Sequence, residues 1–221
     1  MNKHDTALEL FTDISLHELY AQRPFRQERH TYATDKVSII QIVSTLPEEE
    51  YEVLAKPNAW YVMNKPKNRD KVFTLDGLVT LLNLIPKVDF EACQACGGDG
   101  KVDFEFEYDG ETYYKSADCP VCHGTGEKDL DVAVRDFRYG VKFESDTCPL
   151  KQKYLVKLIN TMELLEVNSA RLVYADTQTY KFELSDDVEV LFLCYYPKPE
   201  YEDFFICYKG EDNCKAKEKQ P

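Results

Sequence analysis

The sequence predicts an α+β protein in which a frame of strand-helix-three-strand meander units is interrupted by an inserted zinc-bound β-hairpin module. Three observations predict this fold class. A helical apolar stripe precedes three strand-like runs within residues 139–196, a second strand-rich segment lies at residues 30–44, and two CxxCxGxG strings flank an alternating apolar and acidic segment between them. We expect a discontinuous α+β frame over residues 1–88 and 131–208, an inserted module over residues 89–130, and a flexible tail over residues 209–221.

Composition excludes several classes of protein. The 221 residues include 27 basic and 40 acidic side chains, and the net charge of −13 argues against a mainly cationic nucleic-acid binder. The 43% of apolar residues is typical of a globular protein, and the chain contains no run of about 18 apolar residues that could cross a bilayer. The first residues, MNKHDTALEL, lack the continuous apolar region of a signal peptide. We therefore expect a protein of the reducing cytoplasm, with no membrane partner.

The first half of the frame is expected to hold a helix, a hairpin and a second helix. Apolar residues at loose helical spacing predict a helix over residues 5–20. Residues 30–44 (HTYATDKVSIIQIVS) are rich in β-branched and aromatic side chains and are interrupted by turn-forming residues at 34–36, which is typical of a hairpin. Residues 75–85 (LDGLVTLLNLI) predict a buried helix that ends at Pro86.

The second half of the frame is expected to hold a strand, a helix and a three-stranded meander. Residues 139–144 are typical of a strand, and Cys148-Pro149 favours a helix start with proline in the first turn. Apolar residues at helical spacing predict the helix itself: Tyr154, Leu155, Leu158, Ile159 and Met162. Three strand-like runs follow, at residues 169–174, 179–184 and 188–196. The aromatic segment 201–208 is either an edge strand or a partner-binding strip.

Four of the eight cysteines stand in two strings, Cys93-Gln-Ala-Cys96-Gly-Gly-Asp-Gly100 and Cys119-Pro-Val-Cys122-His-Gly-Thr-Gly126. Two residues between thiolates let one tight turn direct both sulfurs at a common ion, and the glycines permit the positive φ values of such a turn. Between the strings, residues 102–108 alternate apolar with acidic, and Asp109-Gly110 is typical of a two-residue hairpin turn. A hairpin brings its ends together, and its ends here are the two cysteine pairs.

The sequence therefore predicts one structural zinc ion bound by Cys93, Cys96, Cys119 and Cys122. Four protein ligands leave no open position for a water molecule, and short catalytic signatures such as GxSxG and HExxH are absent. We therefore expect no enzymatic activity. Disulfides, or thiol-disulfide exchange at either cysteine pair, remain the alternative to a metal.

Other residues with potential chemistry have ordinary structural interpretations. His123 adjoins a predicted ligand but is not needed to complete the tetrahedron. The remaining cysteines have no metal-binding spacing and are interpreted as core or surface thiols: Cys148, Cys194, Cys207 and Cys214. Four cations on or beside the predicted helix would give a DNA partner a local basic face, although the same pattern is typical of the solvated side of an amphipathic helix: Lys151, Lys153, Lys157 and Arg171.

The two strings, and the second in particular, resemble the cysteine-rich zinc repeats of DnaJ-type co-chaperones. That family has four such strings and two zinc ions, so the two strings here imply one zinc ion. The resemblance covers about 35 of the 221 residues, and the HPD tripeptide of the J-domain and the Gly/Phe-rich linker are absent. The resemblance implies a fold for the inserted module and a role in holding another protein or a nucleic acid, but not recruitment of a heat-shock ATPase.

The frame carries a second resemblance. Tyr32-Ala33-Thr34-Asp35, followed by Val37-Ser38-Ile39-Ile40, is similar to the alanine-threonine-aspartate-glycine turn of bacterial DNA sliding clamps, with Lys36 in place of the glycine. Each domain of those proteins is a pair of strand-helix-three-strand halves. The resemblance implies that residues 139–196 form one half and the first part of the chain the other. A single domain cannot close a ring, so an oligomer would be required to encircle DNA.

Together these observations predict a non-enzymatic, zinc-binding interaction or adaptor protein with a protein partner, linked to DNA replication or other DNA transactions through its clamp-like frame. The alternative is a chaperone-like module that binds extended polypeptide through the zinc hairpin, using aromatic side chains such as Phe104 and Phe106.

Overall fold

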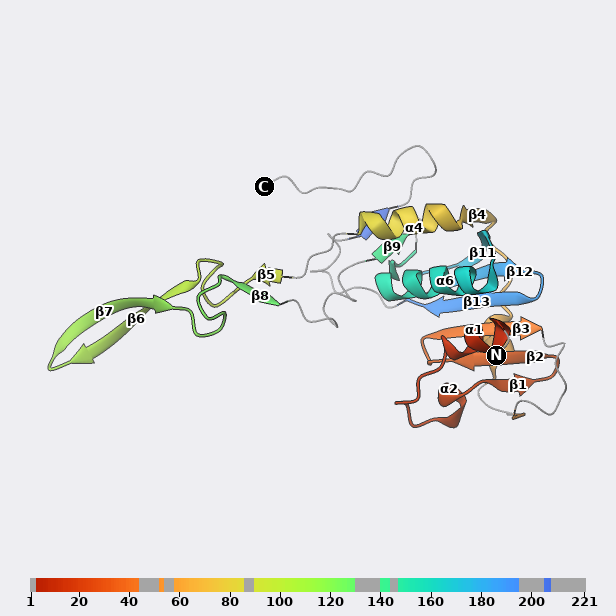
Figure 1. Cartoon of the computed structure of the whole chain (residues 1–221), viewed down its shortest axis with the longest axis horizontal. Coiled ribbons are helices and arrows are strands. Elements are labelled where there is room, and N and C mark those ends of the chain that lie inside the picture. The colour runs from red at the N-terminus through yellow and green to blue at the C-terminus, as the bar shows by residue number, and fades with distance from the viewer. Residues whose placement is uncertain are drawn as a thin grey trace. The chain divides into compact units, whose positions relative to one another are not determined.

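The computed structural model describes residues 3–43, 52–53, 58–85, 90–129, 140–143, 147–194 and 205–207. The chain divides into two compact units (Figure 1). The larger unit comprises residues 1–85 and 136–221, and the smaller unit comprises residues 86–135. The predicted tail at 209–221 lies outside the described residues. No helix in the described part of the chain combines the length and the hydropathy that a membrane crossing requires.

The larger unit is built on a seven-stranded antiparallel sheet with the order β1-β2-β3-β13-β12-β11-β4. Its strands are β1 (Phe25–Gln27), β2 (His30–Thr34), β3 (Ser38–Val43), β4 (Lys71–Thr74), β11 (Ser169–Ala175), β12 (Thr179–Ser185) and β13 (Val188–Leu193). The predicted hairpin at residues 30–44 is confirmed by the pairing of β2 with β3. The predicted meander is confirmed by the consecutive pairing of β11, β12 and β13.

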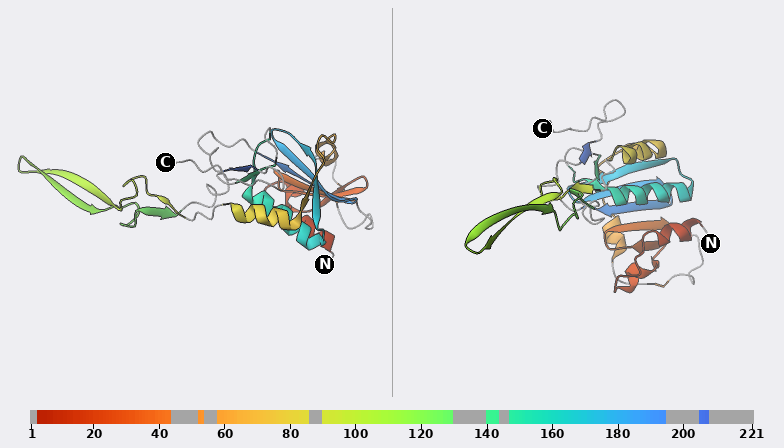
Figure 2. Two further views of the ribbon diagram at one scale, coloured as in Figure 1. Left: turned by 90° about the horizontal axis from the view of Figure 1, so that it is seen from above. Right: turned by 60° about the vertical axis from the view of Figure 1, so that its left-hand side comes forward.

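The order of the sheet shows two similar halves. The meander β1-β2-β3 and the meander β13-β12-β11 meet at their last strands, because β3 pairs with β13 from Val188↔Ile42 to Phe192↔Ser38. Each meander is preceded by a helix, α1 (Lys3–Glu9) in the first half and α6 (Gln152–Leu165) in the second, and these two helices contact each other. Figure 2 shows both helices, together with α4 (Leu75–Leu84), on one side of the sheet.

Aromatic side chains fill the space between the sheet and these helices. The Phe192 ring of β13 lies 6.1 Å from that of Phe11 and 5.6 Å from that of Tyr154, measured between centroids. Because side chains alternate across a strand, the neighbouring Leu191 points to the opposite face. There it packs with Ala59 and Met63 of α3 (Ala59–Met63), next to α2 (Leu19–Gln22). Both faces of the central strands are therefore buried.

Two predicted helix boundaries are wrong. The helix expected over residues 5–20 ends at Glu9, where the Thr12 hydroxyl donates to the Glu9 carbonyl at 3.0 Å. The Asp13 carboxylate then accepts the Ser15 N–H at 2.9 Å, and this local turn competes with helical hydrogen bonding. Cys148-Pro149 does not start the second helix. Residues Leu150–Lys151 instead form the short strand β10, and α6 begins at Gln152.

The helix predicted at residues 75–85 is confirmed as α4, which ends at Leu84. It is amphipathic rather than fully buried, since Leu78 and Leu81 are buried while Leu84 is 46% exposed. The Thr74 hydroxyl caps it by accepting the Gly77 N–H at 3.1 Å. A Cβ at position 77 would lie 3.0 Å from that hydroxyl, so the glycine in the first turn permits the cap to approach closely.

A small sheet completes the larger unit. It has the order β10-β9-β14, in which β9 (Gly140–Lys142) is central and β14 (Phe205–Cys207) pairs parallel to it. The strand predicted at residues 139–144 is therefore confirmed over three residues. The edge-strand interpretation of residues 201–208 is also confirmed, over residues 205–207.

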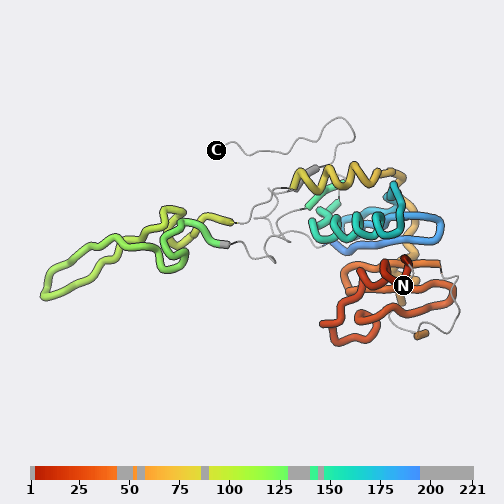
Figure 3. Tube along the Cα trace, in the orientation of Figure 1, coloured from red at the N-terminus to blue at the C-terminus, as the bar shows by residue number. Residues whose placement is uncertain are grey.

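The smaller unit contains two antiparallel strand pairs, β5 (Phe90–Ala92) with β8 (Glu127–Asp129) and β6 (Lys101–Tyr108) with β7 (Glu111–Asp118). Figure 3 traces the path from β5 through the β6–β7 hairpin to β8. The two-residue turn predicted at Asp109-Gly110 is present, with φ values of 53° and 79° at these residues. Such positive values match the twist of a hairpin turn.

Candidate metal centre

The four predicted ligands lie together at the base of the β6–β7 hairpin. The sulfurs of Cys93, Cys96, Cys119 and Cys122 all lie within 4.8 Å of one another. The distance is 3.9 Å between the sulfurs of Cys93 and Cys119, and 3.8 Å between those of Cys96 and Cys122. Sulfurs bound at ~2.3 Å around a tetrahedral ion would be roughly 3.8 Å apart. The spacing therefore fits a metal ion, and the four cysteines could bind one.

The two strings build the centre with the same local structure. In each string the glycine that follows the second cysteine by four positions donates its N–H to that cysteine's sulfur, Gly100 to Cys96 at 3.2 Å and Gly126 to Cys122 at 3.3 Å. The strings also bind each other reciprocally. The Cys93 N–H donates to the Gly126 carbonyl, and the Cys119 N–H donates to the Gly100 carbonyl, both at 2.8 Å. Neither string can therefore complete its own hydrogen bonding without the other.

Two glycines make this close approach sterically allowed. A Cβ at Gly100, which has φ of +73°, would lie 2.4 Å from the Gly124 carbonyl oxygen. A Cβ at Gly126, with φ of +77°, would lie 2.2 Å from the Gly98 carbonyl oxygen. Both distances are far below van der Waals contact, and both backbones are in the left-handed region that favours glycine. The last glycine of each CxxCxGxG string is thus required by the packing of the two turns.

The four cysteine thiols are buried, but the pKa values of two of them, Cys93 and Cys122, are shifted in opposite directions. The sulfur-bearing side chains are buried, with exposed fractions of 0% for Cys119 and 9% for Cys96. Burial raises the pKa of the Cys93 thiol to about 11. Burial opposes ionisation of Cys122 as well, but the Gly126 N–H and the neighbouring thiols outweigh it and lower the pKa of Cys122 to about 7. Hydrogen bonds from backbone N–H groups stabilise a thiolate, the form that binds metals.

The other candidates do not join this centre. His123 is exposed and is not among the clustered ligand atoms. Cys148 and Cys194 are buried in the larger unit, where the Cys194 thiol hydrogen-bonds to Cys148 and lowers the pKa of Cys148, while burial raises that of Cys194. These two are core thiols, as expected. Cys214 and the Cys207 side chain lie outside the described residues.

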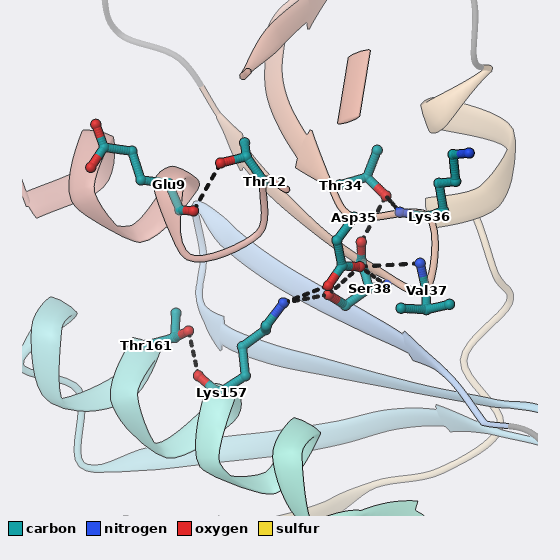
Figure 4. Close-up of polar contacts among 9 residues, drawn as sticks. All are labelled: Glu9, Thr12, Thr34, Asp35, Lys36, Val37, Ser38, Lys157 and Thr161. Atoms are coloured by element: carbon teal, nitrogen blue, oxygen red, sulfur yellow. Dashed lines mark hydrogen bonds and ion pairs between the residues drawn. The ribbon is translucent and has the colours of Figure 1, made fainter. Parts of the chain in front are cut away.

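Three of the four cations that could have formed a basic face lie in separate places. Lys151 pairs with Gly140 in the small sheet and is 6% exposed, and Arg171 lies on β11 near Asp70, at 3.8 Å. Lys157 reaches from α6 to the Asp35 carboxylate at 2.7 Å and to the Ser38 hydroxyl at 3.0 Å (Figure 4). Lys151, Lys157 and Arg171 therefore lie in different environments, while Lys153 is exposed on α6. The sequence could not show this, because Lys157 and Asp35 are 122 residues apart.

Asp35 organises the turn between β2 and β3. Its carboxylate accepts the Val37 N–H at 3.1 Å and the Ser38 N–H at 2.6 Å, in addition to the Lys157 ammonium. Lys36, which occupies the glycine position of the turn named above, has φ of 72°. A non-glycine residue there costs about 1–2 kcal/mol. The side chain also forms a 2.5 Å ion pair with Glu18, which raises the pKa of Lys36.

A second concave surface lies on the larger unit. An apolar cavity of about 250 Å³ opens on the face of the sheet opposite α1 and α6. Its lining is formed mainly by side chains of β3, β13, α2 and α3, including Tyr20, Ile39, Val62, Leu191 and Leu193. Beside it on α3, Trp60 and Tyr61 are 47% and 71% exposed. Sequence patterning did not reveal this surface, because its residues come from four separate elements.

No protein-family model matches the chain, and no curated protein matches its sequence. The resemblance of the strings to DnaJ-type repeats therefore stays a prediction. Among solved structures, the chain is similar to the Helicobacter pylori β clamp bound to a DNA ligase peptide, with 11% identity and a TM-score of 0.47 over 86% of this chain and 62% of that one. It is also similar to the DNA polymerase sliding clamp of Bacillus subtilis, with 7% identity and a TM-score of 0.42 over 89% of this chain and 63% of that one. A third similar structure is the DNA polymerase III β subunit of Thermotoga maritima, with 12% identity and a TM-score of 0.40 over 90% of this chain and 63% of that one. The chain spans less than two thirds of the length of these proteins.

Proposed function

We propose that this chain is a non-enzymatic interaction protein of the adaptor type, whose smaller unit is held folded by one zinc ion bound through Cys93, Cys96, Cys119 and Cys122. The observation that carries the proposal is the buried cluster of four sulfurs, all within 4.8 Å of one another. Four sulfur donors in a tetrahedral arrangement favour zinc, and a set of four protein ligands leaves no position for a reactant.

The adaptor role is supported by the presence of a separate interaction surface on each unit. The larger unit has the apolar cavity bordered by Trp60 and Tyr61. The smaller unit has a hairpin with exposed aromatic residues, of which Phe106 is 50% exposed. Exposed apolar surface of this kind is typical of protein-protein contact. A protein that binds through both units would bring two partners together.

Metal analysis tests the proposal directly. Elemental analysis of purified protein is expected to find about one zinc ion per chain, and the Cys122→Ser variant is expected to lose it. The matched control is Cys148→Ala, which removes a thiol from the larger unit and is expected to keep the zinc. After chelation, limited proteolysis is expected to cut within residues 90–129, because metal binding supplies folding free energy to so small a unit. Protein without metal, or unchanged protease resistance after chelation, would contradict the proposal.

We further propose that the larger unit links the protein to DNA replication or another DNA transaction. The support is its internal arrangement, in which two helix-and-meander halves meet at β3 and β13 with their helices on one side, as in the sliding-clamp domains named above. Sedimentation is expected to show an oligomer, and the oligomer is expected to stay on closed circular DNA and to leave it when the DNA is cut. A strict monomer without affinity for DNA or replication proteins would remove this role.

A chaperone-like function is the second candidate, and the exposed aromatic residues of the hairpin favour it. A holding protein binds many unfolded chains with little selectivity, so it is expected to suppress the aggregation of a denatured test protein. An adaptor is not expected to do so. The aggregation assay therefore separates the two candidates without requiring the natural partner.

A further inference from the structure

The β6–β7 hairpin has two chemically different faces. Residues directly opposite each other in an antiparallel pair share a face. The aromatic face carries Phe104, Phe106, Tyr108 and Tyr113, with exposed fractions between 41% and 72%, and the rings of Phe106 and Tyr113 stack with centroids 5.4 Å apart. The acidic face carries Asp103, Glu105 and Glu107 from β6, opposite Ser116, Tyr114 and Thr112 of β7.

The hairpin also has unpaired strand edges. Within the described residues, β6 pairs only with β7, so its outer edge presents free backbone N–H and C=O groups along an eight-residue strand. Such an edge can accept a further strand from another polypeptide. Three of the four carboxylates of the acidic face belong to β6. The fourth, Asp118 of β7, lies opposite Lys101 at the end of the strand pair next to Cys119. Asp103, Glu105 and Glu107 lie opposite uncharged residues, so β6 carries the larger share of the negative charge on this face.

We infer that the β6 edge binds an extended segment of a partner protein in which apolar and basic residues alternate. A strand added beside β6 would place alternate side chains on the two faces of the hairpin. Its apolar residues would cover Phe104 and Phe106, and its lysines or arginines would lie beside Asp103, Glu105 and Glu107. The inference rests on the proposed function, because the hairpin begins and ends at the metal centre, where Val102 packs against the four cysteines.

A second copy of the chain fits this edge poorly. Pairing of β6 with β6 from another copy would bring rows of carboxylates together, and like charges directly opposite each other destabilise a sheet. The whole chain also carries a net charge of −13, which attracts a cationic segment. Charge complementarity thus selects a basic partner.

A designed peptide tests the inference with the full-length, zinc-loaded protein. The probe is an acetylated, fluorescent peptide of about eight residues, the length of the strand, in which lysine alternates with valine and isoleucine. Saturable binding is expected in a fluorescence anisotropy titration, and it is expected to weaken with salt. An analogue with glutamate in place of lysine is expected not to bind. A peptide of the same composition with its lysines in one block is expected to bind at least about tenfold more weakly, because it cannot match both faces.

Two single substitutions locate the site. Phe106→Ser is expected to weaken binding by about tenfold or more, the loss typical of an aromatic anchor. Tyr114→Ser is the matched control, because it removes an aromatic ring of the same hairpin that is 74% exposed and lies on the acidic face. Its effect is expected to stay within about twofold. Glu105→Gln is expected to weaken binding and to reduce its salt dependence.

The outcomes separate this inference from the proposed function. Protein that contains zinc but does not bind the alternating peptide would overturn the inference and leave the metal-stabilised unit in place. Equal loss in the Phe106→Ser and Tyr114→Ser variants, or equal binding of the lysine and glutamate peptides, would overturn it as well. So would a concentration-dependent dimer that is lost in Phe106→Ser, because a second copy would then cover the face. Protein without zinc would instead contradict the proposed function.

Discussion

The contact between Asp35 and Lys157 is expected to couple the two halves of the larger unit. Asp35 belongs to the β2–β3 turn of the first half, and Lys157 belongs to α6 of the second. We predict that Asp35→Asn and Lys157→Met each destabilise this unit, and that the double variant is less destabilised than the sum of the two. The substitutions keep most of the side-chain volume, so the change is mainly one of charge and hydrogen bonding.

The magnitude follows from how deeply the pair is buried. The Lys157 and Asp35 side chains are 19% and 15% exposed, so the pair is closer to a buried ion pair than to a surface one. Breaking a buried pair costs about 3–5 kcal/mol, and an exposed pair contributes only about 0.2–1 kcal/mol. We expect about 2 kcal/mol for each single variant. The coupling energy is expected to be about 1 kcal/mol or more, because the pair shares a network with Ser38.

Urea unfolding followed by fluorescence measures these values. Trp60 is the single tryptophan of the chain and lies in α3, so its emission reports the larger unit independently of the metal centre. With an m value of about 2 kcal/mol/M, a loss of 2 kcal/mol moves the midpoint by about 1 M urea. Strictly additive variants, with a coupling energy below about 0.3 kcal/mol, would refute the reasoning, since independent sites add within that error.

Three further predictions concern other parts of the chain. Gly126→Ala is expected to abolish metal binding, because its Cβ would lie 2.2 Å from a carbonyl oxygen. The matched control is Gly97→Ala, whose Cβ meets no atom within 4 Å. This control is expected to keep the metal and to lose about 1 kcal/mol of folding free energy, because φ is positive at that position. Tyr180→Phe is expected to cost about 1–2 kcal/mol in urea unfolding, because the buried hydroxyl donates to the Cys148 carbonyl at 2.7 Å. For Asp176, burial is outweighed by hydrogen bonds, chiefly from the Tyr174 hydroxyl, and the pKa of Asp176 is lowered. The stabilisation that Asp176 provides is therefore present above the pKa of this carboxyl in the unfolded chain, and it is lost as pH falls through the pKa in the folded protein. In the Asp176→Asn variant, the free energy of unfolding is expected to decline less steeply below about pH 4.

Each of these has an outcome that would contradict it. Zinc retained at full stoichiometry in Gly126→Ala would show that the two turns can separate. A Tyr180→Phe variant as stable as the parent would show that the hydroxyl contributes nothing to the core. If the free energy of unfolding of Asp176→Asn declined below about pH 4 as steeply as that of the parent, other carboxylates would be responsible for the acid sensitivity of the larger unit.

Local patterns in the sequence predicted local structure well. The alternation and turn residues of 30–44 led to β2 and β3, and the two CxxCxGxG strings led to four sulfurs that lie together. These features depend on interactions between residues close in the chain or joined by one hairpin. The metal itself stays a prediction, because cysteine spacing and sulfur distances describe a site and not its occupant.

Long-range contacts are what the sequence could not show. The pairing of β3 with β13 joins residues nearly 150 positions apart, as the hydrogen bond from Gln41 to Glu189 illustrates. The ion pair of Lys157 was missed for the same reason, since its partner Asp35 lies in the other half of the unit. The helix expected over residues 5–20 ends earlier than predicted, because the Asp13 side chain offers the backbone a local alternative to helical bonding.

The pairing of β5 with β8 has a consequence for how this chain can vary. Phe90 and Asp129 are opposite each other in that pair, so the polypeptide runs out to the cysteine-rich segment and back through neighbouring positions, about 4.8 Å apart. The segment between these two residues can therefore be deleted or replaced in a homologous chain, because a short turn is enough to connect Phe90 to Asp129. The β6–β7 hairpin can likewise become longer or shorter by whole residue pairs near its turn. Its length can therefore change while the geometry of the four cysteines is kept.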